Sequence, residues 1–276
     1  MISEGYKDRR SEGDTTLRQC QLVQLHLLHV FDKICKDNGF HYLLEGGTLI
    51  GAMRHNGFIP WDDDLDVGMP LSDYKRFLDL AGKVLPSDVI LDNPAATRHI
   101  AIPFAKIRDT HSFFHEQSGS MLTSDPSGIY IDIFPYEEMP DFPYWLQKLI
   151  VKACGSTWMR SRWFYNKAKG FLPGLLYSTL GGLCALAHGI VRAGVWVLKK
   201  LRRGTYCYLL FERGDVFRYR MSSMFPPAMH RFEDGEFPVP NDANDILTSQ
   251  YGDWREIPPP ENRPHHARII DPFHSA

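Results

Sequence analysis

The sequence predicts an α/β or α+β fold, because runs of strand-forming residues alternate with amphipathic helical runs over the first ~140 residues. The composition suits a packed core, since 43% of the 276 residues are hydrophobic and 13% are aromatic. The chain shows no internal repeat and no low-complexity tract. We therefore expect a globular protein with one large domain or two smaller ones.

The first predicted element is an amphipathic helix over 15–38, whose apolar residues recur on one face and which stops before Gly39. Tyr42–Leu44 has the pattern of a short buried strand. A short helix through Met53 follows, and the Gly46-Gly47 pair that precedes it allows a close approach of the backbone. The chain thus opens with a helix, a strand and a glycine turn.

Asp64–Met69 alternates acidic with apolar residues and ends at Pro70, which predicts a half-buried strand. Ser72 is then expected to cap a helix that runs to about Ala81. Further strands are expected over 100–107, 112–116 and 128–134, the last ending at Pro135, and a further helix over 241–251. This order of strands and helices is that of a catalytic core followed by a long tail.

The charge of the chain is divided unevenly. The formal net charge is only -2, which excludes a strongly cationic nucleic-acid-binding surface. Residues 142–211, however, contain eleven Lys or Arg and no Asp or Glu. We therefore predict a catalytic core over 15–141, a basic helical insertion over 142–211 and a C-terminal segment over 212–276 that wraps the core.

The stretch 171–191 in this insertion is uncharged if His188 is neutral, and it is about as long as a membrane span. Prolines and glycines interrupt it, and basic residues flank it on both sides, which favours an element in the plane of an anionic membrane surface over a span. The alternative is a helical hairpin of the globular domain with a basic groove for substrate phosphates.

The cysteines and the N-terminus indicate where the protein works. The five cysteines are scattered and lack the spacing of a metal finger or a redox motif, so we expect reduced thiols. Residues 1–14 are polar and charged, without the apolar region of a signal peptide. We therefore expect a cytoplasmic protein, peripheral on the inner face of the plasma membrane if the insertion meets lipid.

Three carboxylates are expected to converge on one site. In an extended strand Asp64 and Asp66 point to the same face, with Cα atoms ~6.7 Å apart. Asp132 lies between Ile131 and Ile133 on a strand that we expect nearby. Clustered carboxylates repel one another unless a divalent cation neutralises them, so the pattern indicates Mg²⁺ or Mn²⁺.

The acidic run has three other possible interpretations. Asp62–Asp64 can be a solvated turn, with Asp62 a supporting residue rather than a ligand. A calcium loop is disfavoured because its sixth position, which needs Gly, holds Val67. A nucleotide-sugar glycosyltransferase is disfavoured because only 63 residues precede Asp64, too few for the ~100-residue nucleotide-binding unit that comes before such a pair.

The run Leu44–Asp66 resembles the signature of the LicD family, which includes bacterial phosphocholine transferases and fukutin-related proteins. The similarity extends through 106–109 and 131–135 to 251–254 and covers most of the chain outside the insertion. It implies a nucleotidyltransferase-like mixed sheet flanked by helices. Gly46-Gly47, the Asp64/Asp66 pair and Asp132 match the family pattern position by position. The clustered cysteines of the zinc-bearing relatives are missing, so no zinc is expected.

The resemblance implies a metal-dependent enzyme. It would pass phosphocholine or a similar phosphoalcohol from a CDP-alcohol donor to a hydroxyl of a cell-surface glycan, or of a lipid-linked glycan precursor, and release CMP. Two alternatives stay open: a nucleotidyltransferase that releases pyrophosphate and a non-catalytic scaffold of glycan assembly. No nucleic-acid partner is expected.

The site residues follow from the matched motifs. Asp64 and Asp66 would hold Mg²⁺, and Asp132 would complete the metal site or act as general base. Backbone N–H groups and a hydroxyl would meet the donor phosphates at Gly46, Gly47 and Thr48. Further substrate-binding candidates, each with a purely structural alternative, are Arg54, His55, Lys106, Arg108, Arg263 and His266. Trp61 is expected to pack and orient the acidic strand.

Overall fold

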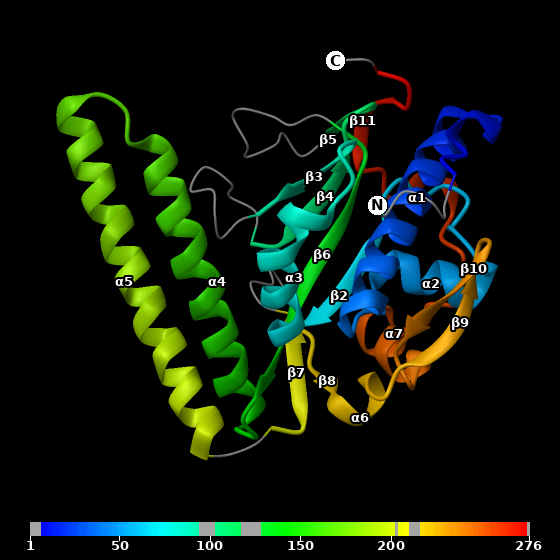
Figure 1. The fold of residues 1–276 in the computed structure, drawn as a ribbon. Helices are drawn as coiled ribbons and strands as arrows, with labels where there is room; N and C mark the ends of the chain where they lie inside the picture. Colours follow the sequence, from blue (N-terminus) through cyan, green and yellow to red (C-terminus); the bar gives the residue numbers. More distant parts are fainter. Residues whose placement is uncertain (1–6, 94–102, 117–127, 202–203, 210–215, 275–276) are drawn as a thin grey trace.

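The computed structural model describes residues 7–93, 103–116, 128–201, 204–209 and 216–274 (Figure 1). Its centre is a mixed sheet in the order β1-β2-β6-β4-β3, and β7, which also pairs with β8, continues along β6 beyond β4. These strands are β1 (Leu43–Leu44), β2 (Asp66–Pro70), β3 (Val89–Asp92), β4 (Ala105–Asp109), β6 (Tyr130–Met139), β7 (Tyr206–Leu209) and β8 (Tyr219–Arg220). The expected mixed α/β architecture is confirmed.

Only one strand pair of this sheet is parallel. β2 and β6 run side by side in the same direction, with Asp66 opposite Asp132, while the other neighbours are antiparallel. This register brings two acids that are 66 positions apart in the sequence to the same level of the sheet. The parallel pair is therefore the element on which the acidic site is built.

Five helices of the core surround the sheet: α1 (Thr16–Asn38), α2 (Gly46–His55), α3 (Leu71–Val84), α6 (Met221–Met224) and α7 (Ala243–Tyr251). The helix α1 begins where the Thr15 side chain accepts the N–H of Arg18, and it ends at Gly39, whose φ of 62° is left-handed. Its buried face packs on the sheet and meets α3 through Phe31 and Phe77, whose ring centroids are 5.1 Å apart. The single long helix expected at the start of the fold is present.

The remaining small elements lie around this core. Two antiparallel strand pairs join β5 (Phe113–Glu116) to β11 (Ala267–Asp271) and β9 (Ala228–Phe232) to β10 (Gly235–Val239). Two short 3₁₀ helices, Arg10–Glu12 and Pro260–Asn262, complete the described elements. Because β11 pairs with β5, the C-terminal segment returns to the catalytic core.

Two long helices, α4 (Tyr144–Lys167) and α5 (Phe171–Leu201), form a hairpin between β6 and β7. In Figure 1 the helix α5 is the outermost element, and α4 lies between it and the rest of the protein. The hairpin falls within the predicted insertion 142–211, although β7, in the same range, pairs with β6 of the central sheet. The three domain limits derived from charge stay a prediction.

Several predicted boundaries differ from the structure. The strand β2 begins at Asp66, so Asp64 precedes it, and α3 begins at Leu71 rather than after Ser72. The strand β6 was expected to end at Pro135 but continues to Met139. Pro135 lies between the stretch of β6 that pairs with β4, which ends at Ile133, and the stretch that pairs with β7. Its missing N–H therefore breaks no backbone hydrogen bond to β4 or β7, and the strand can continue. Of the strand expected over 100–107, residues 100–102 lie outside the described chain, and β4 begins at Ala105.

Candidate active site

An acidic loop, Asp62–Asp64, leads into β2, and α1 fixes its backbone. The side-chain amide of Gln21 donates to the carbonyl oxygen of Asp62 at 3.0 Å, and that of Gln24 donates to the carbonyl oxygen of Asp63 at 2.8 Å. Both glutamines are buried. These bonds provide partners for two carbonyl oxygens of the loop backbone. The three side-chain carboxylates of the loop interact with other groups.

The N-terminus of α2 approaches the same carboxylates. The Thr48 hydroxyl accepts the N–H of Asp66 at 2.8 Å, which holds the start of β2 beside the first turn of the helix. A Cβ atom placed on Gly46, whose φ is +54°, would lie 3.2 Å from Asp66 Oδ2, and one on Gly47 would lie 2.7 Å from Asp62 Oδ2. The two glycines thus admit carboxylates where a side chain would clash.

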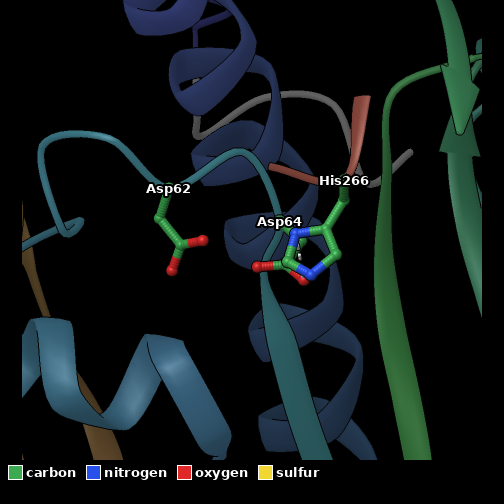
Figure 2. Close-up of side chains that lie close together, drawn as sticks. All are labelled: Asp62, Asp64 and His266. Carbon is green, nitrogen blue, oxygen red and sulfur yellow. Dashed lines mark ion pairs between the residues drawn. The ribbon is translucent and has the colours of Figure 1, made fainter. Parts of the chain in front are cut away.

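The side chains of Asp62, Asp64 and His266 lie close together (Figure 2). The ligand atoms of Asp62, Asp64 and His266 all lie within 4.8 Å of one another. Asp62 projects toward α2, whereas His266 reaches in from the C-terminal segment, with its Nδ1 3.2 Å from Asp64 Oδ2. The tail residue that the sequence could only suggest is therefore part of the site.

Asp66 and Asp132 lie deeper in the sheet beside this group. They are register partners on β2 and β6. The backbone pairing of the two strands extends to the residue before Asp66, because the N–H of Asp132 donates to the carbonyl oxygen of Leu65 at 2.9 Å. Asp132 Oδ1 is 3.1 Å from Nζ of Lys106, which also pairs with Glu116 at 2.9 Å. Asp66 and Asp132 thus lie on neighbouring strands as expected, but the group whose ligand atoms lie within 4.8 Å of one another in the described part of the chain is Asp62, Asp64 and His266, not the expected set of Asp64, Asp66 and Asp132.

Burial makes the negative charge of this cluster costly. Burial, together with the charge of Asp64, raises the pKa of Asp62 to about 8. Burial also raises the pKa of Asp66 well above its usual value, with Asp64 and Asp132 adding to the effect. The pKa of Asp132 rises to about 6 because burial outweighs the attraction of Lys106. A divalent cation would relieve this cost, and carboxylate oxygens are the donors that Mg²⁺ and Mn²⁺ prefer, so the residues fit such an ion.

Next to the acidic loop lies a cavity of about 580 Å³, which we call the acidic cavity. Its lining includes Gly47, Asp62, Asp64 and His266. The other lining residues belong to α2, to the segment before the acidic loop and to the tail: Ile50, Arg54, Ile59, Trp61, Tyr251, Asp253, Trp254, Glu256, Pro258, Pro259, Asn262 and Pro264. A drug-sized or nucleotide-sized ligand fits a space of this volume and would lie against both the carboxylates and the aromatic rings.

Arg54, His55 and Arg263 all lie close to Trp61, but of these four residues only Arg54 and Trp61 line the acidic cavity. The Arg54 side chain donates to the carbonyl of Trp254 at 3.0 Å, and its Nε lies 3.0 Å from His55 Nε2. The guanidinium carbon of Arg263 lies 3.9 Å from the centre of the Trp61 ring. Trp61 is partly buried against the core, in line with the expected packing role, and it places two guanidinium groups near the acidic loop.

Lys106 and Arg108 are buried, with exposed fractions of 2% and 3%. Residues that bind phosphate at the opening of a cavity would be more exposed. Arg108 forms an ion pair with Asp92 and donates to the carbonyl of Gly128 at 3.2 Å. Neither residue lines the acidic cavity. The structure therefore brings Lys106 to Asp132 and leaves the binding of donor phosphates by both residues as a prediction.

The sequence did not single out every residue of the site. The solvated turn considered for Asp62–Asp64 is wrong, because Asp62 and Asp63 are only 7% and 3% exposed. The carboxylate of Asp63 accepts hydrogen bonds from the backbone N–H groups of His266 and Ala267. Gln21 and Gln24, three residues apart on α1, were a sequence signal for the anchoring of the loop backbone, but nothing in the sequence marked the bonds from the tail.

Comparison with known proteins shows the family of the chain. The family described as LicD/FKTN/FKRP, nucleotidyltransferase domain, matches residues 39–169. The lipopolysaccharide cholinephosphotransferase LicD of Haemophilus influenzae is 30% identical in an alignment of 271 positions that covers 91% of this chain and 96% of that protein. Shorter matches are 50% identity over 44 residues with human ribitol 5-phosphate transferase FKRP (16% of this chain, 9% of that protein) and 31% over 93 residues with yeast mannosyltransferase regulator 4 (32% and 8%). The chain therefore belongs to the LicD family.

Proposed function

We propose that this protein transfers a phosphoalcohol of the phosphocholine type from a CDP-activated donor to a glycan hydroxyl, with Mg²⁺ or Mn²⁺ and with release of CMP. The observation that carries the proposal is the acidic loop at the wall of a cavity large enough for a nucleotide donor. The named functions of two relatives, cholinephosphotransferase and ribitol 5-phosphate transferase, support the same class of reaction.

The cation would be held by Asp62, Asp64 and Asp66, and when bound it would neutralise negative charge on the donor diphosphate. The first turn of α2 would supply backbone N–H groups to the same phosphates, because its glycines leave the backbone open toward the acidic loop. Arg54 lines the cavity and can add a guanidinium contact. Transfer of this kind depends chiefly on positioning and charge stabilisation.

Asp132 would take the proton of the acceptor hydroxyl or complete the metal site. A carboxylate with a pKa of about 6 is charged at neutral pH, yet it is more basic than an ordinary carboxylate. The ammonium group of Lys106, 3.1 Å from Asp132 Oδ1, favours the charged form of the carboxylate. Acceptance of the proton would leave the hydroxyl oxygen free to attack phosphorus.

The acceptor that we propose is a cell-surface glycan or its lipid-linked precursor, modified on the cytoplasmic side at the inner face of the plasma membrane. The named lipopolysaccharide substrate of the Haemophilus relative supports a glycan acceptor. The five cysteines are free thiols in the structure, in keeping with a reducing compartment.

The test is to incubate the purified protein with Mg²⁺, a glycan acceptor and a panel of CDP-alcohols, and to measure CMP. Release of CMP with one alcohol, dependent on Mg²⁺ and abolished in Asp64→Asn, would support the proposal. Asp79→Asn, which changes an exposed acid on α3, is the matched control and should retain wild-type turnover. CMP release that is equal in wild type and Asp64→Asn would refute it.

A further inference from the structure

The helix α5 presents an apolar face to the outside of the protein. Eight large aliphatic residues on this face are between 47% and 78% exposed: Leu172, Leu175, Leu176, Leu183, Leu186, Ile190, Val197 and Leu201. Their spacings of three, four and seven residues place them on one stripe along the whole helix. Residues that follow this spacing usually form the buried side of a helix in a globular protein.

The opposite side of α5, which contacts the protein, combines small and polar residues with the buried Val195. Gly181 packs against Tyr165 of α4, and His188 Nδ1 lies 3.2 Å from the carbonyl oxygen of Cys154. Arg192 and Lys199 pair with Glu137 of β6, a residue that is only 3% exposed. These contacts fix the rotation of the helix, so the aliphatic stripe cannot turn inward without breaking a buried ion pair.

We propose that the aliphatic stripe of α5 lies in the plane of an anionic lipid bilayer, with its side chains at the boundary between headgroups and acyl chains. The exposed face of α4 supports this partner, because it carries both aromatic and basic side chains: Trp145, Lys152, Arg160, Trp163 and Lys167. Trp and Lys or Arg are the residues that settle at headgroup depth. The absence of any acid from 142–211 matches a negatively charged surface.

The ion pairs of the hairpin argue against a transmembrane orientation. By length and composition α5 can cross a membrane, since it has 31 residues and only 6% of its most apolar stretch is buried. A crossing would carry Arg192, together with the basic side chains of α4 packed alongside, into hydrocarbon. In the plane of the surface these groups stay at the polar side.

A second copy of this chain is a poorer partner for the stripe. Two hairpins packed face to face would bring two sets of basic side chains together, with no acid in 142–211 to offset them. An anionic bilayer instead gains from each of these charges. The inference concerns the hairpin alone and does not depend on the proposed transfer reaction.

The test is flotation of the full-length protein with two kinds of vesicle, phosphatidylglycerol mixed with phosphatidylethanolamine, and phosphatidylcholine alone. Wild type should float with the anionic vesicles at low salt and much less with the neutral ones. The variant Leu176→Gln/Leu183→Gln/Leu186→Gln/Ile190→Gln should bind the anionic vesicles at least ~10-fold more weakly, because it removes four aliphatic side chains from the stripe. Acyl-chain bromination should quench tryptophan fluorescence in wild type but not in this variant.

The matched control is Met229→Gln/Ile269→Gln, which changes two exposed apolar residues outside the hairpin and should bind like wild type. Circular dichroism and Mg²⁺ binding should be unchanged in both variants, since all substituted side chains face outward. Wild type that stays unbound with anionic vesicles, or a stripe variant that floats like wild type, would overturn the inference. If the wild type does not bind vesicles but forms a dimer, and the stripe variant does not form this dimer, the partner of the stripe is a second copy of the chain instead.

Discussion

Asp63 in the acidic loop and His266 in the C-terminal segment are bonded to each other although 203 positions separate them. His266 Nδ1 lies 3.0 Å from Asp63 Oδ1, and the backbone N–H of His266 donates to the same carboxylate at 3.1 Å. Ala267 adds a further N–H at 2.8 Å. Burial alone would raise the pKa of Asp63, but these hydrogen bonds outweigh it and hold that pKa below its usual value. A charged Asp63 thus fastens the tail to the loop that carries Asp62 and Asp64.

We expect Asp63→Asn to loosen the tail and weaken donor binding. The amide keeps the shape but loses the charge and one acceptor, so the free energy of unfolding should fall by about 1–3 kcal/mol. Because the tail lines the acidic cavity, KM for the donor should rise ~10-fold or more, while kcat changes less. Steady-state kinetics and urea denaturation measure both effects. An unchanged KM would mean that the tail does not shape the donor site.

Asparagine substitutions at Asp62, Asp64, Asp66 and Asp132 should each remove nearly all Mg²⁺-dependent turnover with the fold retained. Each variant loses a hard anionic group but keeps its side-chain volume, so a drop of roughly 100-fold or more in activity is expected. The sequence suggested a smaller effect for Asp62, but its place within 4.8 Å of Asp64 and His266 now predicts a comparable loss. Full activity in any one variant would remove that residue from the site.

Gly47→Ala should impair metal binding more than folding. The new methyl group would lie 2.7 Å from Asp62 Oδ2, so either the carboxylate or the first turn of α2 must shift. Gly82→Ala in α3 is the matched control, because nothing lies within 4 Å of its Cβ position, and it should stabilise the helix by about 0.5–1 kcal/mol. Calorimetric Mg²⁺ titration of both variants, with thermal melts, tests this difference. Wild-type Mg²⁺ affinity in Gly47→Ala would show that Asp62 is not needed for the ion.

Mg²⁺ affinity should rise with pH through the neutral range. The pKa of Asp62 is raised to about 8, so this carboxyl is mostly protonated at neutral pH, and burial shifts the pKa of Asp66 in the same direction. The cation needs the deprotonated forms, and its binding must release protons, up to ~10-fold in affinity per pH unit for each proton released. Titrations in buffers of different ionisation enthalpy should show this release. Equal affinity well below and well above the pKa of Asp62 would contradict it.

The parts of the fold set by local pattern were predictable from the sequence. The capped helix α1 and the alternation of acidic and apolar residues around β2 each depend on neighbours in the chain, whereas the Gly46-Gly47 pair, expected to precede the short helix, forms its first turn. That Asp132 lies on a strand near the Asp64/Asp66 pair was also expected, whereas its register directly opposite Asp66 was not. These features follow from periodicities of 3.6 and 2 residues.

The parts set by distant contacts were not predictable. Asp63 is buried only because His266 and Ala267 return to it, and no local pattern records a contact of that range. Arg108 shares a strand face with Lys106, yet Asp92 on the neighbouring strand β3 takes its guanidinium. In each case the partner depends on the register of the sheet or on the path of the C-terminal segment. A single sequence specifies neither of them.

The most direct test of the central claim is to follow the β-phosphorus of an isotopically labelled CDP-alcohol. The account predicts that the glycan gains the labelled phosphorus together with its alcohol, that CMP carries away the α-phosphorus, and that Asp64→Asn and Asp66→Asn abolish both products. A nucleotidyltransferase would instead use a nucleoside triphosphate and attach the α-phosphorus with its nucleoside. Nucleoside found on the acceptor, with pyrophosphate released, would contradict the proposed transfer.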